Sequence, residues 1–71
     1  MTVTLYTRQG CHLCDQVKQA ISSAQRLDAF EYEEFDIDSD PSLLQMYDEE
    51  VPVITIDGER ATVEELWRRL S

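Results

Sequence analysis

Apolar positions divide the chain into segments with two kinds of spacing. Residues 2–7 (TVTLYT) are rich in β-branched and aromatic residues without strong alternation, which predicts a strand covered on both faces. From Leu13, apolar residues recur at offsets of 4, 7, 8 and 11, which predicts a helix. Its inner stripe consists of Leu13, Val17, Ala20, Ile21 and Ala24. We expect this helix to fray near residues 25–27.

Residues 30–37 form the second predicted strand, although its pattern is imperfect. The apolar positions change parity between Tyr32 and Phe35, which indicates either a bulge or a strand that begins after Phe30. Asp40 and Pro41 then mark a helix start, as N-cap and first helical residue. The inner face of this short helix is Leu43, Leu44 and Tyr47, with Met46 beside it.

The C-terminal third predicts a hairpin followed by a helix. Residues 51–57 are the third strand, Asp57-Gly58 is a two-residue hairpin signal, and residues 59–61 are a short fourth strand. Thr62 is expected to cap the last helix, with Glu65 as its capping-box partner. The buried stripe of that helix is Val63, Leu66, Trp67 and Leu70.

The element order β-α-β-α-β-β-α defines the fold class. A helical crossover joins the first two strands, so they are parallel, and the hairpin makes the last two antiparallel. We therefore expect an α/β fold with a mixed four-stranded sheet and about three helices on its faces. At this length, residues 1–71 are expected to form a single domain with a thin core.

Charge and hydropathy limit the partners. A formal net charge of −9 argues against nucleic acid and against anionic membrane surfaces, and mildly favours basic partner surfaces. We find no signal peptide and no apolar run near the length of about 18 residues that a membrane span requires. The sequence thus predicts a soluble, cytoplasmic protein, which we expect to be a monomer.

The only two cysteines, Cys11 and Cys14, stand between the first strand and the first helix. One pair this close is too sparse for a disulfide-stapled scaffold, whereas Cys-x-x-Cys near a βαβ pattern indicates a redox site. A cysteine at a helix N-terminus is stabilised as a thiolate by the helix dipole. Two alternatives are ordinary buried cysteines and a metal site. With His12, the pair gives at most three ligands where a structural zinc site needs four, so we predict no bound metal.

The run Leu5-Tyr6-Thr7-Arg8-Gln9-Gly10-Cys11-His12-Leu13-Cys14 resembles the opening of the glutaredoxins. Val51-Pro52 resembles the cis-proline loop of that family, and the element order is that of the minimal thioredoxin fold. The most similar group is the short glutaredoxin-like proteins, and the resemblance covers essentially the whole chain.

This resemblance implies roles for several residues. Cys11 would be the attacking thiolate and Cys14 the more buried resolving thiol. Pro52 would be cis, which leaves the Val51 backbone to pair with an extended substrate or glutathione. Arg8 would support the thiolate and meet a glutathione carboxylate.

Two residues inside and beside the motif are expected to support it. Gly10 and His12 are poor neighbours for a buried core, which weakens the interpretation of the cysteines as structural. A protonated His12 that donates to the Cys11 sulfur would lower the pKa of that thiol; the alternative is an exposed and inert side chain.

The chain departs from typical glutaredoxins in two places. It lacks the Gly-Gly that precedes an acidic pair at the start of the last helix, since residues 57–65 contain Gly58 alone, and Glu50 stands where a Thr is usual. Thioredoxins do not match better, because Leu5 and Gly10 replace their buried Asp and their Trp.

The first functional hypothesis is a thiol–disulfide oxidoreductase that reduces protein or glutathione mixed disulfides. It needs no tightly bound cofactor, and either glutathione as a co-substrate or a thioredoxin-reductase-like flavoprotein would supply electrons. The alternative is a non-catalytic thioredoxin-fold module that binds peptides along Val51 or senses redox state.

Overall fold

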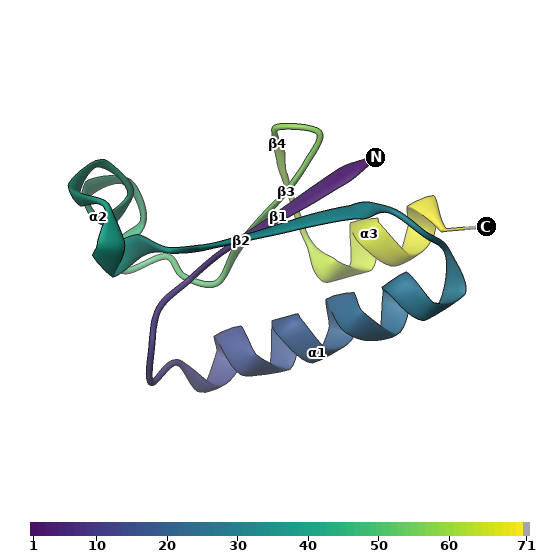
Figure 1. Cartoon of the computed structure of the whole chain (residues 1–71), viewed down its shortest axis with the longest axis horizontal. Coiled ribbons are helices and arrows are strands. Elements are labelled where there is room, and N and C mark those ends of the chain that lie inside the picture. The colour runs from purple at the N-terminus through teal and green to yellow at the C-terminus, as the bar shows by residue number, and fades with distance from the viewer. Residues whose placement is uncertain (71) are drawn as a thin grey trace.

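The computed structural model describes residues 1–70 and has the predicted element order (Figure 1). The elements are β1 (Thr2–Thr7), α1 (His12–Leu27), β2 (Glu31–Asp36), the 3-10 turn η1 (Ile37–Ser39), α2 (Pro41–Tyr47), β3 (Val53–Ile56), β4 (Glu59–Ala61) and α3 (Val63–Arg69). The strand order in the sheet is β2-β1-β3-β4. Strand β1 runs parallel to β2 and antiparallel to β3, so the sheet is mixed, as predicted.

Helices α1 and α3 lie on the same face of the sheet (Figure 1). The register places Leu5 of β1 opposite Ile54 of β3, so both side chains point toward these helices. The buried core on this side is Val3, Leu5, Ile21, Ala24, Ile54, Ile56 and Leu66. Burial of these aliphatic side chains is the main force that holds the two layers together.

The opposite face of the sheet is covered by side chains more than by helices. Helix α2 lies at one end of the sheet and reaches this face through Tyr47, whose ring packs on Tyr6 at 4.8 Å between centroids. Phe35 of β2 stacks on Tyr6 at 5.8 Å, and Thr4 is also buried, so β1 is covered on both faces as predicted. The seven residues of α2 span only about 10 Å, which is too short to cover four strands.

Strand β2 begins at Glu31, after Phe30, which agrees with the second of the two alternatives for this segment. Tyr32 points toward the helices opposite Val3, whereas Phe35 points to the other face opposite Tyr6. Ile37 has left the strand for η1 and is fully buried. The change of parity therefore reflects residues on two faces and a strand that ends at Asp36.

Two residues predicted in buried helical stripes are exposed. Leu13 is 61% exposed because the buried line of α1 passes through Cys14, Ile21 and Ala24, with the cysteine acting as a small apolar residue. Trp67 is 37% exposed because its neighbour Leu66 occupies the centre of the α3 stripe. Helix α1 also remains regular to its last residue, where the Asp28 N–H donates to the Ala24 carbonyl at 3.1 Å.

The predicted caps and turn are confirmed. The Asp40 carboxylate accepts from the Ser42 N–H at 2.9 Å, and the Thr62 hydroxyl accepts from the Glu65 N–H at 3.1 Å. Asp57 and Gly58 have φ values of 52° and 87°, as a tight hairpin turn of this kind requires. Within residues 1–70, no helix has the length and apolar character needed to cross a membrane.

A hydrogen bond on β2 predicts a pH-dependent contribution to stability. The Tyr32 hydroxyl donates to Glu34 at 2.7 Å, which lowers the pKa of Glu34, and Lys18 pairs with the same carboxylate at 3.2 Å. Burial and the Glu34 contact raise the pKa of Tyr32. The depressed Glu34 pKa adds stability at neutral pH that is lost as pH falls through it, and the raised Tyr32 pKa adds stability that is lost as pH rises above its unfolded value of about 10.

Tyr32→Phe should therefore lower the free energy of unfolding by about 0.5–1 kcal/mol at pH 7. The loss is small because solvent screens the partly exposed carboxylate. The difference from the unmodified protein should shrink both near pH 3 and above pH of about 10. Urea unfolding at these three pH values measures it. A difference that stays constant across the range would show that the loss does not come from the hydrogen bond between the hydroxyl and the Glu34 carboxylate.

Candidate redox site

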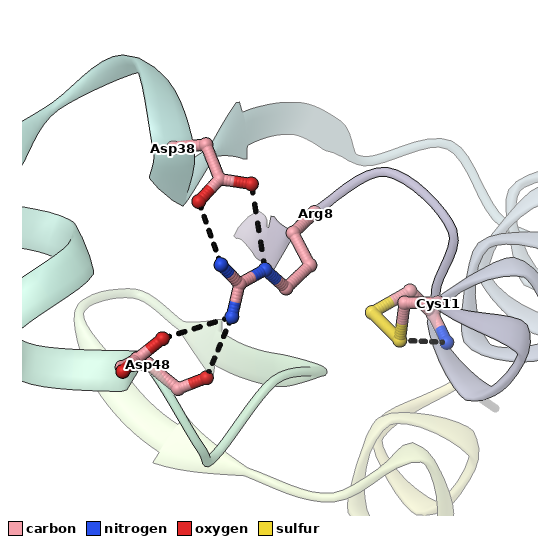
Figure 2. Close-up of a disulfide and its surroundings, with 5 residues drawn as sticks. Arg8, Cys11, Asp38 and Asp48 are labelled. Atoms are coloured by element: carbon pink, nitrogen blue, oxygen red, sulfur yellow. Dashed lines mark hydrogen bonds and ion pairs between the residues drawn. A yellow bond between two sulfur atoms is a disulfide. The ribbon is translucent and has the colours of Figure 1, made fainter.

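Cys11 and Cys14 form a disulfide at the start of α1. Cys11 is the N-cap residue, with φ −100° and ψ 107°, and its Sγ accepts from the Cys14 N–H at 3.1 Å (Figure 2). The two Cα atoms are 5.2 Å apart, within the usual range for a disulfide. Cys14 is fully buried, whereas Cys11 is partly exposed. Cys11 is therefore the sulfur that a substrate can reach.

The position of Cys11 favours a thiolate after reduction. Its sulfur lies at the N-terminus of a 16-residue helix, where backbone N–H groups have no intrahelical partner. The N–H of Cys14 already points at this sulfur, so a negative charge there would receive a charge-assisted hydrogen bond. Both effects lower the pKa of a thiol at this position.

The peptide bond Val51–Pro52 is cis, as the family resemblance implied. Strand β3 starts to pair with β1 at Val53, which lies opposite Tyr6, so Val51 precedes the paired part of the strand. Both Val51 and Pro52 are half-buried. Whether the Val51 backbone binds substrate stays a prediction.

Arg8 lies in the loop between β1 and Cys11, and its guanidinium is directed toward two carboxylates (Figure 2). Its Nε and Nη2 donate to the two carboxylate oxygens of Asp38 at 3.4 and 2.7 Å. Its Nη1 donates to the Asp48 carboxylate at 2.9 Å and to the Asp48 carbonyl at 3.0 Å. Arg8 thus joins three segments, and its donors are directed to these aspartates and away from the disulfide.

Gly10 and His12 flank Cys11 differently. Gly10 has a φ of +75°, a left-handed conformation that glycine adopts without a steric penalty, so it serves the turn into the helix. His12 is the first residue of α1 and is exposed. Among residues 1–70, the hydrogen bond to the Cys11 sulfur comes from the Cys14 backbone, so tuning by His12 stays a prediction, to be tested by the Cys11 pKa in His12→Ala.

A polar hollow of about 390 Å³ opens beside the loop that leads into Cys11. It is lined by Thr7, Arg8, Gln9, Gly10, Asp15, Lys18, Glu34 and Asp36. Charges of both signs meet here, with three carboxylates and two cations. Over the described residues, no group of three or more His, Cys, Asp or Glu side chains is arranged to hold a metal ion.

Sequence reasoning missed the two partners of Arg8. Asp38 could have been found, because parallel strands β1 and β2 end at the same edge of the sheet and Arg8 and Asp38 each follow one of them. Asp48 gave no such signal, because the path of the chain after α2 depends on how that helix packs.

The family model for the Glutaredoxin-like domain (DUF836) matches residues 2–70. The chain belongs to this family. The match includes both cysteines and the cis-proline, so the site described above is that of a short glutaredoxin-like protein. No curated protein sequence is significantly similar to the chain.

Solved structures place this glutaredoxin-like protein among thioredoxin folds. A structural-genomics target protein from X. campestris is 37% identical, with a TM-score of 0.68, and the match covers 83% of this chain and 76% of that one. The thioredoxin-like protein BC3987 is 31% identical, with a TM-score of 0.69 and coverage of 93% and 96%. A point mutant of BC3987 matches at 27% identity and a TM-score of 0.71, with coverage of 97% and 99%.

Proposed function

We propose that this glutaredoxin-like protein is a thiol–disulfide oxidoreductase. The observation that carries the proposal is the asymmetric pair at the start of α1, with a reachable Cys11 and a fully buried Cys14 joined in a disulfide. A reversible dithiol needs one sulfur that is accessible to the substrate and a second that lies within bonding distance of the first. This pair has both properties.

The reaction transfers two electrons from the dithiol to a substrate disulfide. The Cys11 thiolate attacks one substrate sulfur, which forms a mixed disulfide and releases the other substrate sulfur as a thiolate. Cys14, after losing its proton, attacks Cys11 Sγ in the mixed disulfide. This forms the Cys11–Cys14 disulfide and releases the second substrate thiolate. Substrate is reduced, the protein is oxidised, and an external thiol must return the two electrons.

We expect disulfide-containing proteins as substrates, held beside Val51 and Pro52, with glutathione or a flavoprotein reductase as the electron donor. A glutathione redox titration tests the function and the donor together. The protein is equilibrated in mixtures of reduced and oxidised glutathione, the thiols are trapped by alkylation, and the species are identified by mass spectrometry.

The expected result is reversible interconversion of the dithiol and the Cys11–Cys14 disulfide, at a potential of roughly −200 to −270 mV. An additional species that carries one glutathione on Cys11 would identify glutathione as a co-substrate. A cysteine pair that remains in one redox state over the whole range of glutathione mixtures would contradict the proposed oxidoreductase function. Reversible oxidation with no turnover of any disulfide substrate would support the sensing module.

A further inference from the structure

The end of α2 and the segment that leads from it to β3 are attached to the rest of the molecule at three points. The ring of Tyr47 packs on Tyr6, and Glu50 pairs with Arg60 of β4 at 2.8 Å. The third attachment is Asp48, which Arg8 holds through both its carboxylate and its carbonyl. Of these three, only the third reaches the loop that leads into Cys11.

Arg8 is well suited to fix geometry. It grips Asp38 with two parallel N–H groups while its remaining nitrogen contacts Asp48, so the planar guanidinium defines the relative positions of η1, the end of α2 and its own loop (Figure 2). The hydrogen bonds to Asp38 and Asp48 raise the pKa of Arg8. A guanidinium is charged at every pH at which thiol chemistry takes place, so the pairing with the two aspartates does not depend on the protonation of Arg8.

The charge balance argues against a role for Arg8 as counter-ion of the thiolate. One guanidinium and two carboxylates give the Arg8–Asp38–Asp48 cluster a formal charge of −1. The two bound carboxylates offset the charge of the guanidinium, which reduces the positive potential that it could provide at the Cys11 sulfur. A substrate carboxylate would also have to displace two aspartates before it could bind this guanidinium.

We propose that Arg8 is a positioning residue that fixes segment 48–52, with Val51 and Pro52, against the loop that leads into Cys11. The inference rests on the proposed oxidoreductase function. It also assigns a substrate class: extended peptide disulfides, bound by shape and backbone contacts. Anionic thiols such as glutathione find the guanidinium already occupied.

Asp48→Asn is the decisive variant, because the two possible roles of Arg8 predict opposite results. The substrate is a quenched, disulfide-linked neutral peptide, with dithiothreitol to regenerate the dithiol. A positioning role predicts that kcat/KM falls about fivefold, mainly through a higher KM. The reason is that a weaker contact between Arg8 and Asp48 leaves segment 48–52, which is proposed to bind the peptide, less firmly fixed. A counter-ion role predicts an unchanged or increased kcat/KM, since the variant removes a negative charge that competes for Arg8.

Two Arg8 variants complete the test. Arg8→Lys keeps the charge but lacks the planar fork, so positioning predicts nearly the same loss as in Arg8→Gln. The double variant Arg8→Lys with Asp48→Asn should have the same kcat/KM as the less active of the two single variants, because both changes weaken the same contact between Arg8 and Asp48. Wild-type activity in Arg8→Lys, or additive losses in the double variant, would overturn the inference.

The Cys11 pKa gives a second readout, from the pH dependence of alkylation. Removal of the Asp48 charge cannot raise this pKa, so a loss of turnover in Asp48→Asn without a raised pKa must come from geometry. Arg68→Ala is the matched control, because Arg68 forms an exposed pair with Glu64 at 2.6 Å within α3. Rates are compared at a temperature at which circular dichroism shows each variant to be folded, so partial unfolding does not imitate the effect.

The failure of the inference and of the proposed function are distinguishable. A wild-type protein that reduces no disulfide substrate contradicts the oxidoreductase. A wild-type protein that turns over the peptide, with Asp48→Asn and Arg8→Lys equally active, contradicts the positioning role alone.

Discussion

Cys11→Ser should abolish the proposed disulfide reduction, with an expected loss in kcat/KM on the order of 10³ or more. Serine stays protonated at neutral pH, so the first attack has no nucleophile, and the fully buried Cys14 cannot replace it. Cys14→Ala has a different effect. It leaves the first attack intact but removes the second, so the mixed disulfide on Cys11 accumulates until an external thiol resolves it.

Mass spectrometry after reaction with a peptide disulfide measures both results. Cys14→Ala should carry one peptide thiol per molecule, and Cys11→Ser should carry none. Thermal unfolding of both variants controls for the fold. Peptide found on Cys14 in the Cys11→Ser variant would show that the roles of the two cysteines are reversed.

Leu5→Ala should destabilise the protein more than any surface change. Leu5 is fully buried in β1, in the core that this strand forms with β3, α1 and α3. Truncation of a leucine at such a site costs about 2–5 kcal/mol. At roughly 0.05–0.15 kcal/mol per residue, the free energy of unfolding of the whole domain is only about 4–11 kcal/mol. A large fraction of the variant should therefore be unfolded at 37 °C.

Urea unfolding, with the disulfide kept oxidised in both proteins, measures this loss. Leu27→Ala is the matched control, because Leu27 is 70% exposed at the last position of α1. We expect it to cost less than about 0.5 kcal/mol. Similar losses at the two positions would mean that the core does not depend on the β1 leucine as its burial indicates.

Local chemistry accounts for what the sequence predicted well. Thr62 with Glu65, Asp40 with Pro41, and the Asp57-Gly58 turn each act within a few residues, so their outcome could be predicted without the tertiary structure. The cysteine pair was equally local. The mixed character of the sheet followed from the two kinds of connection, a helical crossover and a tight hairpin.

What the sequence did not show depends on packing. Leu13 and Trp67 lie one position away from residues on the buried face of their helices, Cys14 and Leu66, and periodicity does not resolve a rotation of that size. The position of α2 at one end of the sheet depends on its short length and on the packing of Tyr47. The direction of the Arg8 side chain depends on Asp48, which lies 40 residues away in sequence.

The central position of β1 has a consequence for synthesis of the chain. This first strand pairs on one side with β2 and on the other with β3, whose residues lie about 50 positions later. A ribosome must therefore release most of the chain before the first strand to emerge has both neighbours. The apolar side of β1 stays incompletely covered until then, because the core also requires Leu66 of the last helix. Folding of this protein is completed only when its C-terminal helix arrives.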